Sequence, residues 1–350
     1  MSRLDSPILE PRVVDTGILV AVVALLATGV ASMFAATPAT AWVYVLHGTT
    51  GVLFLALVVL KLWRVRHRVR VRPSGVWTSL LLAALSVAAL ATGFGWVFGL
   101  ELDVGFWGLL NVHIAFGLLV APVVLFHLRR RFAVASRETL TQRRTVLRSG
   151  GLLVGGAVAW RAQQSLNRLL DTAGADRRFT GSRPAEGDSG NDFPVTMWMA
   201  DDPDPIDTDS WTLSVGGLTE RSLSVGADEL DPDSEQRALL DCTSGWYAER
   251  DWQGLSVGDL LDAVEPHEDA AWVQFRSVTG YRWTLPIDEA RDALLATHVD
   301  GQRLSHGHGY PLRLVAPDRR GYQWVKWVES VEVSRSRDLS ESIAIFVSGL

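Results

Sequence analysis

Long apolar runs fill the first half of the chain, and shorter runs broken by turn residues fill the second half. Four of the long runs lie at 14–36, 41–63, 76–100 and 106–128. Each is close to the roughly 20 residues that a helix needs to cross a bilayer, and buried helices of soluble proteins rarely reach that length without charge. The pattern therefore predicts an all-α transmembrane helix bundle at residues 1–135.

The second half contains five strand-like runs, at 210–218, 271–278, 281–286, 311–317 and 327–334. Two helical patterns, at 256–264 and 288–296, lie between them. Short strands mixed with helices are typical of an α+β domain. We place this domain at 193–335, after a polar linker at 171–192 that has no apolar period and before a C-terminal tail at 336–350.

Charge is divided unevenly between the two halves. Residues 1–170 carry a net charge of +11 and residues 171–350 one of −17, within a total of −6. A basic apolar half joined to an acidic polar half suggests one part among membrane lipids and one in water, and it argues against a nucleic-acid partner. The basic stretches at 61–72 and 129–131 lie on one side of the predicted bundle, so the positive-inside bias places them and the N-terminus in the cytoplasm.

The segment 136–170 decides where the acidic half lies. Arg143 and Arg144 precede a short, glycine-rich and weakly apolar run, an arrangement that resembles a twin-arginine export signal. This run would be a fifth crossing, which puts the acidic half on the extracytoplasmic side of a multi-pass plasma membrane protein. The alternative is a cytoplasmic basic loop followed by an amphipathic helix on the membrane surface.

A repeated histidine pattern marks the second and fourth apolar runs. His47 is followed by Gly51, and His113 by Gly117, each pair on one helical face. Both runs descend from the outer side, so the histidines lie at similar depth, where ionisable groups usually face the bundle interior. Two such imidazoles predict a haem b with His47 and His113 as iron ligands, and glycine lets the macrocycle approach the backbone. Alternatively, each histidine only hydrogen-bonds a neighbouring helix.

Ten residues after each glycine stands a further basic residue, Lys61 in one run and His127 in the other. Four-helix membrane cytochromes of the b type, which this half resembles, often hold a second haem between two histidines at that lower level. His127 lacks this partner, so a second haem there is the lesser of the two expectations. Lys61 near a helix end is more often an interface anchor than a ligand.

The chain contains one cysteine, Cys242. A single cysteine excludes an internal disulfide, and a structural zinc site would need further cysteines and histidines close by. A thiolate suits a high-valent metal that is tuned by sulfur donors, whereas burial as a small hydrophobic residue is the common fate of a lone cysteine. The residue type alone leaves both interpretations open.

Short motifs surround Cys242 in a fixed order. They are FPV (193–195), WTLSVGGLTERSLSV (211–225), LLDCTSGW (239–246), DWQGLSVGDLLDAV (251–264), VQFRSVTGYRWTLPIDEA (273–290) and VDGQRLSHGHGYPLRLVAPDRRGYQWVKWVESVEV (299–333). Together they resemble the molybdopterin-binding domain of the sulfite oxidase superfamily over about 190–335. The resemblance implies a molybdenum-molybdopterin cofactor with Cys242 as a metal ligand, and Tyr281 above the metal assisting proton transfer. It also implies cofactor contacts, with Arg313 suited to the pterin phosphate, from Ser277, His308, Arg313, Gly321, Tyr322, Gln323 and Lys326.

The residues after Cys242 depart from the sulfite oxidase pattern. Animal and plant sulfite oxidases hold the sulfite anion with arginines just after the cysteine, where this chain has Trp246 and Tyr247. Arg250 is the nearest cation, and the sequence does not fix its direction. With Trp252, the spacing is similar to the catalytic subunits of bacterial envelope methionine-sulfoxide reductases, which work with a separate haem-bearing membrane partner.

The fusion of the two halves predicts a membrane-anchored molybdenum oxidoreductase. Its expected reaction is oxygen-atom transfer on a small sulfur-containing substrate, with S-oxide reduction favoured because the anion-holding arginines are absent. Electrons would pass through the membrane haem to or from a quinone or another carrier. The alternatives are a sulfite oxidase or dehydrogenase, and a metal-free membrane electron-transfer or binding protein.

Overall fold

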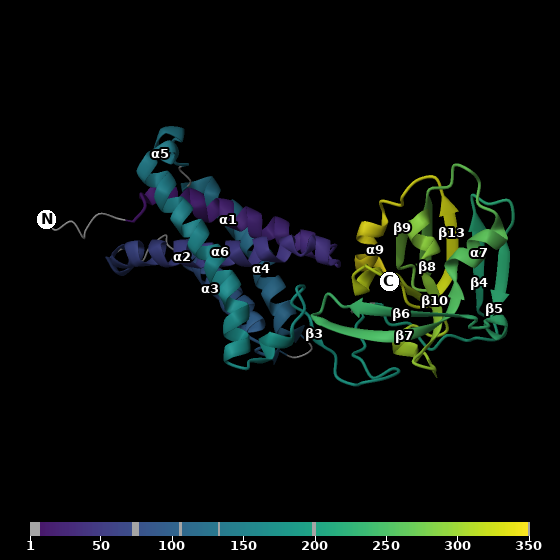
Figure 1. Ribbon diagram of the computed structural model, residues 1–350. Helices are drawn as coiled ribbons and strands as arrows, with labels where there is room; N and C mark the ends of the chain where they lie inside the picture. Colours follow the sequence, from purple (N-terminus) through teal and green to yellow (C-terminus); the bar gives the residue numbers. More distant parts are fainter. Residues whose placement is uncertain (1–7, 72–76, 105–106, 132–133, 198–200, 349–350) are drawn as a thin grey trace. The chain divides into compact units, whose positions relative to one another are not determined.

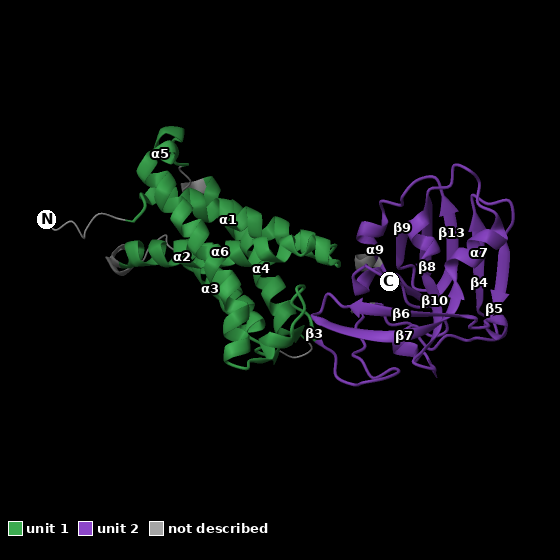
Figure 2. Cartoon of the chain, viewed as in Figure 1, with its two compact units in different colours: residues 1–183 green, residues 184–350 purple. Residues whose placement is uncertain are grey.

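The computed structural model (Figure 1) describes residues 8–71, 77–104, 107–131, 134–197 and 201–348. The chain forms two compact units, residues 1–183 and 184–350, which have different colours in Figure 2. Predicted features at 1–7, 72, 76, 106 and 132–133 lie outside the described residues.

Long apolar helices form the first unit (Figure 1). They are α1 (Pro11–Ser32), α2 (Trp42–Val71), α3 (Trp77–Val97) and α4 (Leu109–Arg131). Each contains a stretch long and apolar enough to cross a membrane, at Pro11–Ser32, Pro38–Arg66, Trp77–Val97 and Leu109–Arg129. The predicted helical class of this half is confirmed, and helices of this kind indicate a membrane-associated protein.

The four helices form two hairpins, because α1 packs along α2 and α3 packs along α4. The first hairpin turns at the short helix η1 (Pro38–Thr40), next to which the Tyr44 hydroxyl donates a hydrogen bond of 2.9 Å to the Ser32 carbonyl. The second hairpin turns through the antiparallel strands β1 (Asp103–Val104) and β2 (Trp107–Gly108).

The helices α5 (Arg137–Thr141) and α6 (Arg143–Leu169) follow. The helix α6 is continuous from Arg143 to Leu169. It packs against α2, where a Cβ at Gly48 would lie 2.3 Å from the Trp160 ring, so only glycine leaves room for this indole. At its end Asn167 donates to the Val97 carbonyl (3.0 Å), and η2 (Ala173–Asp176) follows. Within the described ranges α6 is not among the helices apolar enough for a span, and the fifth crossing stays a prediction.

The second unit is built on two β-sheets (Figure 1). The first sheet contains β6 (Ser234–Asp241), β7 (Trp246–Ser256), β10 (Leu294–Val299), β11 (Gln302–Arg303) and β12 (Arg313–Val315). Antiparallel pairing joins β7 to β6 and β10, and β10 to β11 and β12. The short strand β3 (Arg183–Pro184) lies at the boundary of the two units in sequence.

The second sheet has the order β5-β4-β13-β8-β9. Its strands are β4 (Thr212–Gly217), β5 (Leu223–Gly226), β8 (Trp272–Ser277), β9 (Arg282–Pro286) and β13 (Val328–Ser334). The strands β4 and β13 are parallel, and the other pairs are antiparallel. With η3 (Ala227–Glu229), α7 (Val257–Val264), α8 (Ile287–Arg291) and α9 (Glu341–Val347), these sheets confirm the α+β class.

The helix predicted at 288–296 is wrong beyond its first turn. The helix α8 ends at Arg291, and Leu294–Val299 form β10 between β7 and β12. This strand is buried at nearly every position, so pairing on both sides outweighs the helical pattern of its sequence. The helix predicted at 256–264 is confirmed as α7, and the five predicted strand runs are confirmed as β4, β8, β9, β12 and β13.

Candidate active site and histidine pair

Cys242 stands directly after β6, in the tight turn to β7. Its backbone N–H donates to the Trp246 carbonyl (2.8 Å), and the N–H of Gly245 donates to the Cys242 carbonyl (3.1 Å). Gly245 has a φ of 100°, which L side chains rarely adopt, so the turn depends on glycine. Cys242 is 7% exposed, and its Sγ lies 3.1 Å from the Ser244 hydroxyl. The hairpin therefore presents one sulfur atom at a strand end.

The chain around η5 (Gly321–Gln323) lies against Cys242. Arg320 forms a parallel bridge with Asp241, and the Arg320 guanidinium pairs with the Asp241 carboxylate (2.7 Å). The same guanidinium donates to the Cys242 carbonyl (3.2 Å). A Cβ at Gly321 would lie 3.1 Å from the Cys242 Cα, a close approach that favours glycine. The buried ion pair between Arg320 and Asp241 thus holds the η5 segment against the strand end that carries Cys242.

Two cationic side chains lie near this turn, Arg313 buried and Lys326 partly buried. Arg313, at the start of β12, is 3% exposed and donates to the His308 carbonyl (2.9 Å). Lys326 Nζ donates to the carbonyls of Gly307 (2.6 Å) and Thr196 (3.0 Å). Backbone carbonyls therefore fix the direction of both cations.

Burial changes the protonation of these cations. It lowers the pKa of Arg313 to about 10, and the Cys242 thiolate opposes this change. Burial and then the Arg313 charge lower the pKa of Lys326 to about 7, again opposed by the thiolate. Cys242, Arg313 and Lys326 are thus electrostatically coupled.

His308 lies in η4 (His306–His308) and is held in one neutral tautomer. Its burial lowers the pKa to about 4. Nε2 lies 2.9 Å from the Phe193 carbonyl and Nδ1 lies 2.7 Å from the Ser305 hydroxyl. Because a carbonyl only accepts, Nε2 carries the proton and Nδ1 accepts from the Ser305 hydroxyl.

Tyr281 occupies the turn between β8 and β9. Its hydroxyl donates to the Tyr322 carbonyl (2.6 Å), and burial raises its pKa, so the phenol stays protonated. Ser277 at the other side of the turn accepts hydrogen bonds from the Thr279 N–H (3.3 Å) and hydroxyl (3.0 Å). Ser277 therefore shapes the turn that places Tyr281, and Tyr281 joins it to the η5 segment.

Some buried donors in this region have no partner. Among the described residues, Arg313 Nε and Gln323 Nε2 are buried without a hydrogen-bond acceptor. Leaving such a donor unsatisfied costs about 1–3 kcal/mol. The described part of the chain contains no group of three or more His, Cys, Asp or Glu side chains that could hold a metal ion. One thiolate beside spare donors fits a metal carried by a pterin dithiolene, whose phosphate and ring offer many acceptors.

The direction of Arg250 is settled. It lies inside β7 and is 8% exposed. Its Nε pairs with the Asp300 carboxylate (3.3 Å), and its other two nitrogens donate to the carbonyls of Gly187 (2.7 Å) and Glu249 (3.1 Å). Its guanidinium is committed to these partners.

His47 on α2 and His113 on α4 face each other inside the helical unit. Their ring centroids are 6.3 Å apart and their planes are 83° from parallel. The Nδ1 atom of His47 lies 2.9 Å from the Thr28 hydroxyl, and that of His113 lies 2.9 Å from the Ala89 carbonyl. With Nδ1 engaged on a neighbouring helix, Nε2 is the nitrogen left for another ligand in both rings.

Open space lies one turn beyond each histidine. A Cβ at Gly51 or at Gly117 would meet no atom within 4 Å. Two imidazoles bound to one iron through nitrogens at about 2 Å place their ring centres roughly 6 Å apart. The separation of His47 and His113 and the space beside them fit a haem.

Lys61 is engaged with the first hairpin. Its Nζ lies 3.2 Å from the Asp15 carboxylate, which Arg64 shares at 3.1 Å. This ion pair explains a lysine near the end of α2 without any ligand role. The second haem expected at His127 stays a prediction.

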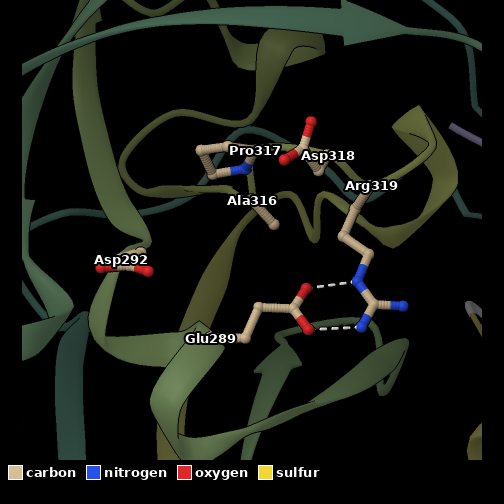
Figure 3. Close-up of a pocket in the computed structure, with 6 residues that line it drawn as sticks. All are labelled: Glu289, Asp292, Ala316, Pro317, Asp318 and Arg319. Atoms are coloured by element: carbon tan, nitrogen blue, oxygen red, sulfur yellow. Dashed lines mark hydrogen bonds and ion pairs between the residues drawn. The ribbon is translucent and has the colours of Figure 1, made fainter. Parts of the chain in front are cut away.

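A cavity of about 300 Å³ lies elsewhere in the second unit (Figure 3). It is lined by Glu289, Asp292, Ala316, Pro317, Asp318 and Arg319. Glu289 and Arg319 form a two-bonded ion pair across it (Figure 3). None of its lining residues belongs to the set expected to bind the cofactor. Arg319 pairs with Glu289 here, whereas the neighbouring Arg320 pairs with Asp241.

Sequence reasoning missed residues that act through the main chain. Thr196 accepts from Lys326 through its carbonyl and from the Trp246 indole through its hydroxyl (3.1 Å). A carbonyl acceptor carries no residue-type signal, so no sequence pattern could have found it. Arg320 was also missed, although its position directly before Gly321 was a usable signal.

An α+β unit with one buried cysteine beside cations and spare buried donors is the arrangement expected of a molybdopterin-binding oxidoreductase. Residues 200–342 match the family described as the oxidoreductase molybdopterin binding domain, and this part of the chain is a domain of the sulfite oxidase superfamily. The predicted superfamily and the oxidoreductase class are therefore confirmed.

Three relatives illustrate the similarity. The uncharacterized oxidoreductase YuiH of Bacillus subtilis is 27% identical over 161 residues, which are 45% of this chain and 81% of the relative. The protein-methionine-sulfoxide reductase catalytic subunit MsrP of Xanthomonas axonopodis pv. citri is 32% identical over 166 residues, or 40% and 52% of the two chains. The putative protein-methionine-sulfoxide reductase subunit YedZ1 of Azospira oryzae is 29% identical over 149 residues, or 41% and 57%. The chain thus spans about half the length of the two methionine-sulfoxide reductase relatives.

Proposed function

We propose that this protein is a membrane-anchored molybdenum-molybdopterin oxidoreductase that removes an oxygen atom from a small S-oxide and draws its electrons through a membrane haem b. The observation that carries the proposal is the Cys242 turn, where one buried thiol stands beside Arg313 and Lys326 and near spare buried donors. The similarity to a methionine-sulfoxide reductase catalytic subunit supports the same reaction class.

The candidate site residues of the second unit have distinct expected roles. The cofactor, when bound, supplies two-electron oxygen-atom transfer. The Cys242 thiolate would hold the metal, and the spare donors of Arg313 and Gln323 would hold the pterin and its phosphate. The Tyr281 phenol keeps its proton at neutral pH and would assist as a hydrogen-bond donor to the oxygen that leaves the substrate. Lys326, with a pKa of about 7, would be the source of protons.

The commitment of Arg250 favours a neutral substrate over sulfite. Binding an oxyanion needs a cation free to pair with it, and a buried unpaired anion is costly. The Arg250 guanidinium already pairs with Asp300 and with two carbonyls. A sulfoxide carries no net charge and does not need this cation.

The helical unit would provide the electron path. The spacing of His47 and His113, their engaged Nδ1 atoms and the space beside Gly51 and Gly117 support one haem between the hairpins. The apolar helices support membrane anchoring, and a quinone in the bilayer would be the electron donor. The basic loops and Arg143–Arg144 support an extracytoplasmic second unit.

The test uses the purified full-length protein and compares Cys242→Ser with Ser244→Ala. The first variant removes the metal ligand, and the second removes only the hydroxyl next to it. We expect Cys242→Ser to lose S-oxide reduction by about 10³-fold or more and to lose molybdenum, while the reduced haem absorption band persists. Ser244→Ala should keep most of its activity and its metal.

Four outcomes would contradict the proposal. Retained turnover in Cys242→Ser, or wild-type protein without molybdenum, would remove the metal site and favour an electron-transfer or binding protein. Faster oxidation of sulfite than reduction of S-oxides, measured with viologen and quinone-analogue mediators, would favour the sulfite oxidase alternative. An unchanged b-type spectrum in His113→Ala would remove the histidine pair as haem ligands.

A further inference from the structure

The two hairpins of the helical unit repeat a short motif besides the histidines. The sequence Ala-Thr-Gly occurs at 27–29 in α1 and at 91–93 in α3. Each threonine faces the histidine of the following helix, Thr28 facing His47 and Thr92 facing His113. Each hairpin therefore places one threonine hydroxyl next to one histidine.

The hydrogen bonds of Thr28 fix its role toward His47. Its hydroxyl donates to the Ala24 carbonyl at 2.6 Å, so its single proton is committed within α1. The Thr28 oxygen, 2.9 Å from His47 Nδ1, must then accept the proton of that nitrogen. This arrangement leaves Nε2 of His47 without a proton.

The equivalent turn in the second hairpin works differently. His113 Nδ1 donates directly to the Ala89 carbonyl at 2.9 Å. The Thr92 hydroxyl donates to the Ala88 carbonyl at 2.7 Å and lies 3.4 Å from His113 Nδ1, which is long for a hydrogen bond. The Ala89 carbonyl selects the tautomer of His113, whereas the Thr28 hydroxyl accepts from His47.

We propose that Thr28 is the positioning residue of the haem ligand His47. It selects the tautomer with a bare Nε2, orients the ring and increases the electron-donating strength of the ligand. This inference rests on the proposed haem site. Thr28 is 6% exposed, so water does not readily replace its hydroxyl. Thr92 has no such role, because the Ala89 carbonyl already accepts from His113.

The experiment compares Thr28→Val, Thr28→Ser and Thr92→Val in the full-length purified protein. Valine keeps the branched shape of threonine and removes the oxygen, whereas serine keeps the oxygen. The measurements are haem content from the reduced-minus-oxidised spectrum, the midpoint potential from a redox titration, and the g values of the ferric haem. Far-UV circular dichroism reports whether the helices remain folded.

We expect Thr28→Val to shift the midpoint potential upward and to change the ferric g values, because a weaker ligand stabilises ferric iron less. Thr28→Ser should restore wild-type values, and Thr92→Val should change them little. Haem loss in folded Thr28→Val that Thr28→Ser reverses would also support the role.

Equal shifts in Thr28→Val and Thr92→Val, or wild-type values in Thr28→Val with full haem content, would overturn the inference and leave the haem site standing. Loss of haem in Thr28→Ser equal to that in Thr28→Val would also overturn it. Wild-type protein without a b-type spectrum would instead refute the haem site itself.

Discussion

At the residue scale, the second unit keeps ionisable groups buried by giving each a specific neighbour. Arg320 pairs with Asp241, whereas Lys326 rests on backbone carbonyls and His308 is neutral between Ser305 and a carbonyl. Burying a charge without such partners would cost several kcal/mol. An ion pair and backbone carbonyls thus hold the positive charges in place around the thiol. The size of this charge depends on pH.

His308 makes folding sensitive to acid. Its folded pKa of about 4 lies below the ordinary value of 6.5, so between these values the unfolded chain binds a proton that the folded chain does not. The free energy of unfolding must therefore fall as the pH falls through this window, by about 2 kcal/mol between pH 7 and pH 5. Chemical denaturation followed by tryptophan fluorescence measures this loss.

The matched variants are His308→Gln and His267→Gln. We expect His308→Gln to be less stable at neutral pH but to lose about 2 kcal/mol less on acidification, since glutamine does not titrate. His267 lies at the surface, 41% exposed, and its variant should behave as the wild type. An equal acid response in all three proteins would mean that His308 is not the source.

The sequence pointed to candidate side chains but not to the groups that hold them. Cys242, Tyr281 and Arg313 were proposed because the motifs around them are distinctive, and their roles stay predictions. Thr196 and Phe193 contribute carbonyls, which any residue offers, so only the folded chain reveals them. The direction of Arg250 was equally hidden, because its partner Asp300 lies 50 residues away in the sequence.

At the element scale, periodicity identified long helices better than strands. The apolar runs gave the four helices that are long and apolar enough to cross a membrane, because a continuous run of that length has few other solutions. The hairpin β6–β7, which carries Cys242, was not predicted from alternation, because β7 buries Arg250 among Trp246 and Trp252. A buried charge inside an alternating strand hides the alternation in the sequence. At such a position tertiary contacts, not the local pattern, determine that the segment is a strand.

The glycines of α2 allow a test of the space beside the histidines. Gly51→Leu adds a side chain where the described protein atoms leave open space, so helix formation should be unaffected or improved. We expect haem content to fall by most of its wild-type value, because leucine would occupy the position of the macrocycle. The absorption spectrum and far-UV circular dichroism of the purified variant report both quantities.

Gly150→Leu on α6 is the matched control. Gly150 also has no atom near an added Cβ, but it lies on a different helix from the histidine pair. It should keep its haem. A full haem complement in Gly51→Leu would show that the space serves another purpose.

At the scale of the whole molecule, the uneven charge matches the division into two units. The basic first half contains the apolar helices, and the acidic half contains the molybdopterin-binding domain. In the proposed topology, export of the second unit depends on whether Arg143 and Arg144 act as a twin-arginine signal or only as positive charges. Substitution of both arginines by lysine would change the topology if they form a twin-arginine signal, but not if only their charge matters.

Replacing both arginines, Arg143→Lys and Arg144→Lys, separates these possibilities. Lysine keeps the positive charge, so a topology set by charge would persist, whereas recognition of a twin-arginine signal would be lost. We expect the second unit to become protected from protease added outside spheroplasts. The control is Arg161→Lys with Arg168→Lys, on the same helix, which should leave the unit accessible. Continued cleavage in the Arg143/Arg144 variant would refute twin-arginine export.

The pairing of one histidine from each hairpin has a consequence for biosynthesis. Neither hairpin alone holds both proposed axial ligands, since His47 belongs to α2 and His113 to α4. In the proposed site, a haem would therefore not be fully ligated until the fourth helix has left the ribosome and met the first pair. A nascent chain arrested after α3 would then lack one of the two ligands, and the order of synthesis would set the earliest moment of haem loading.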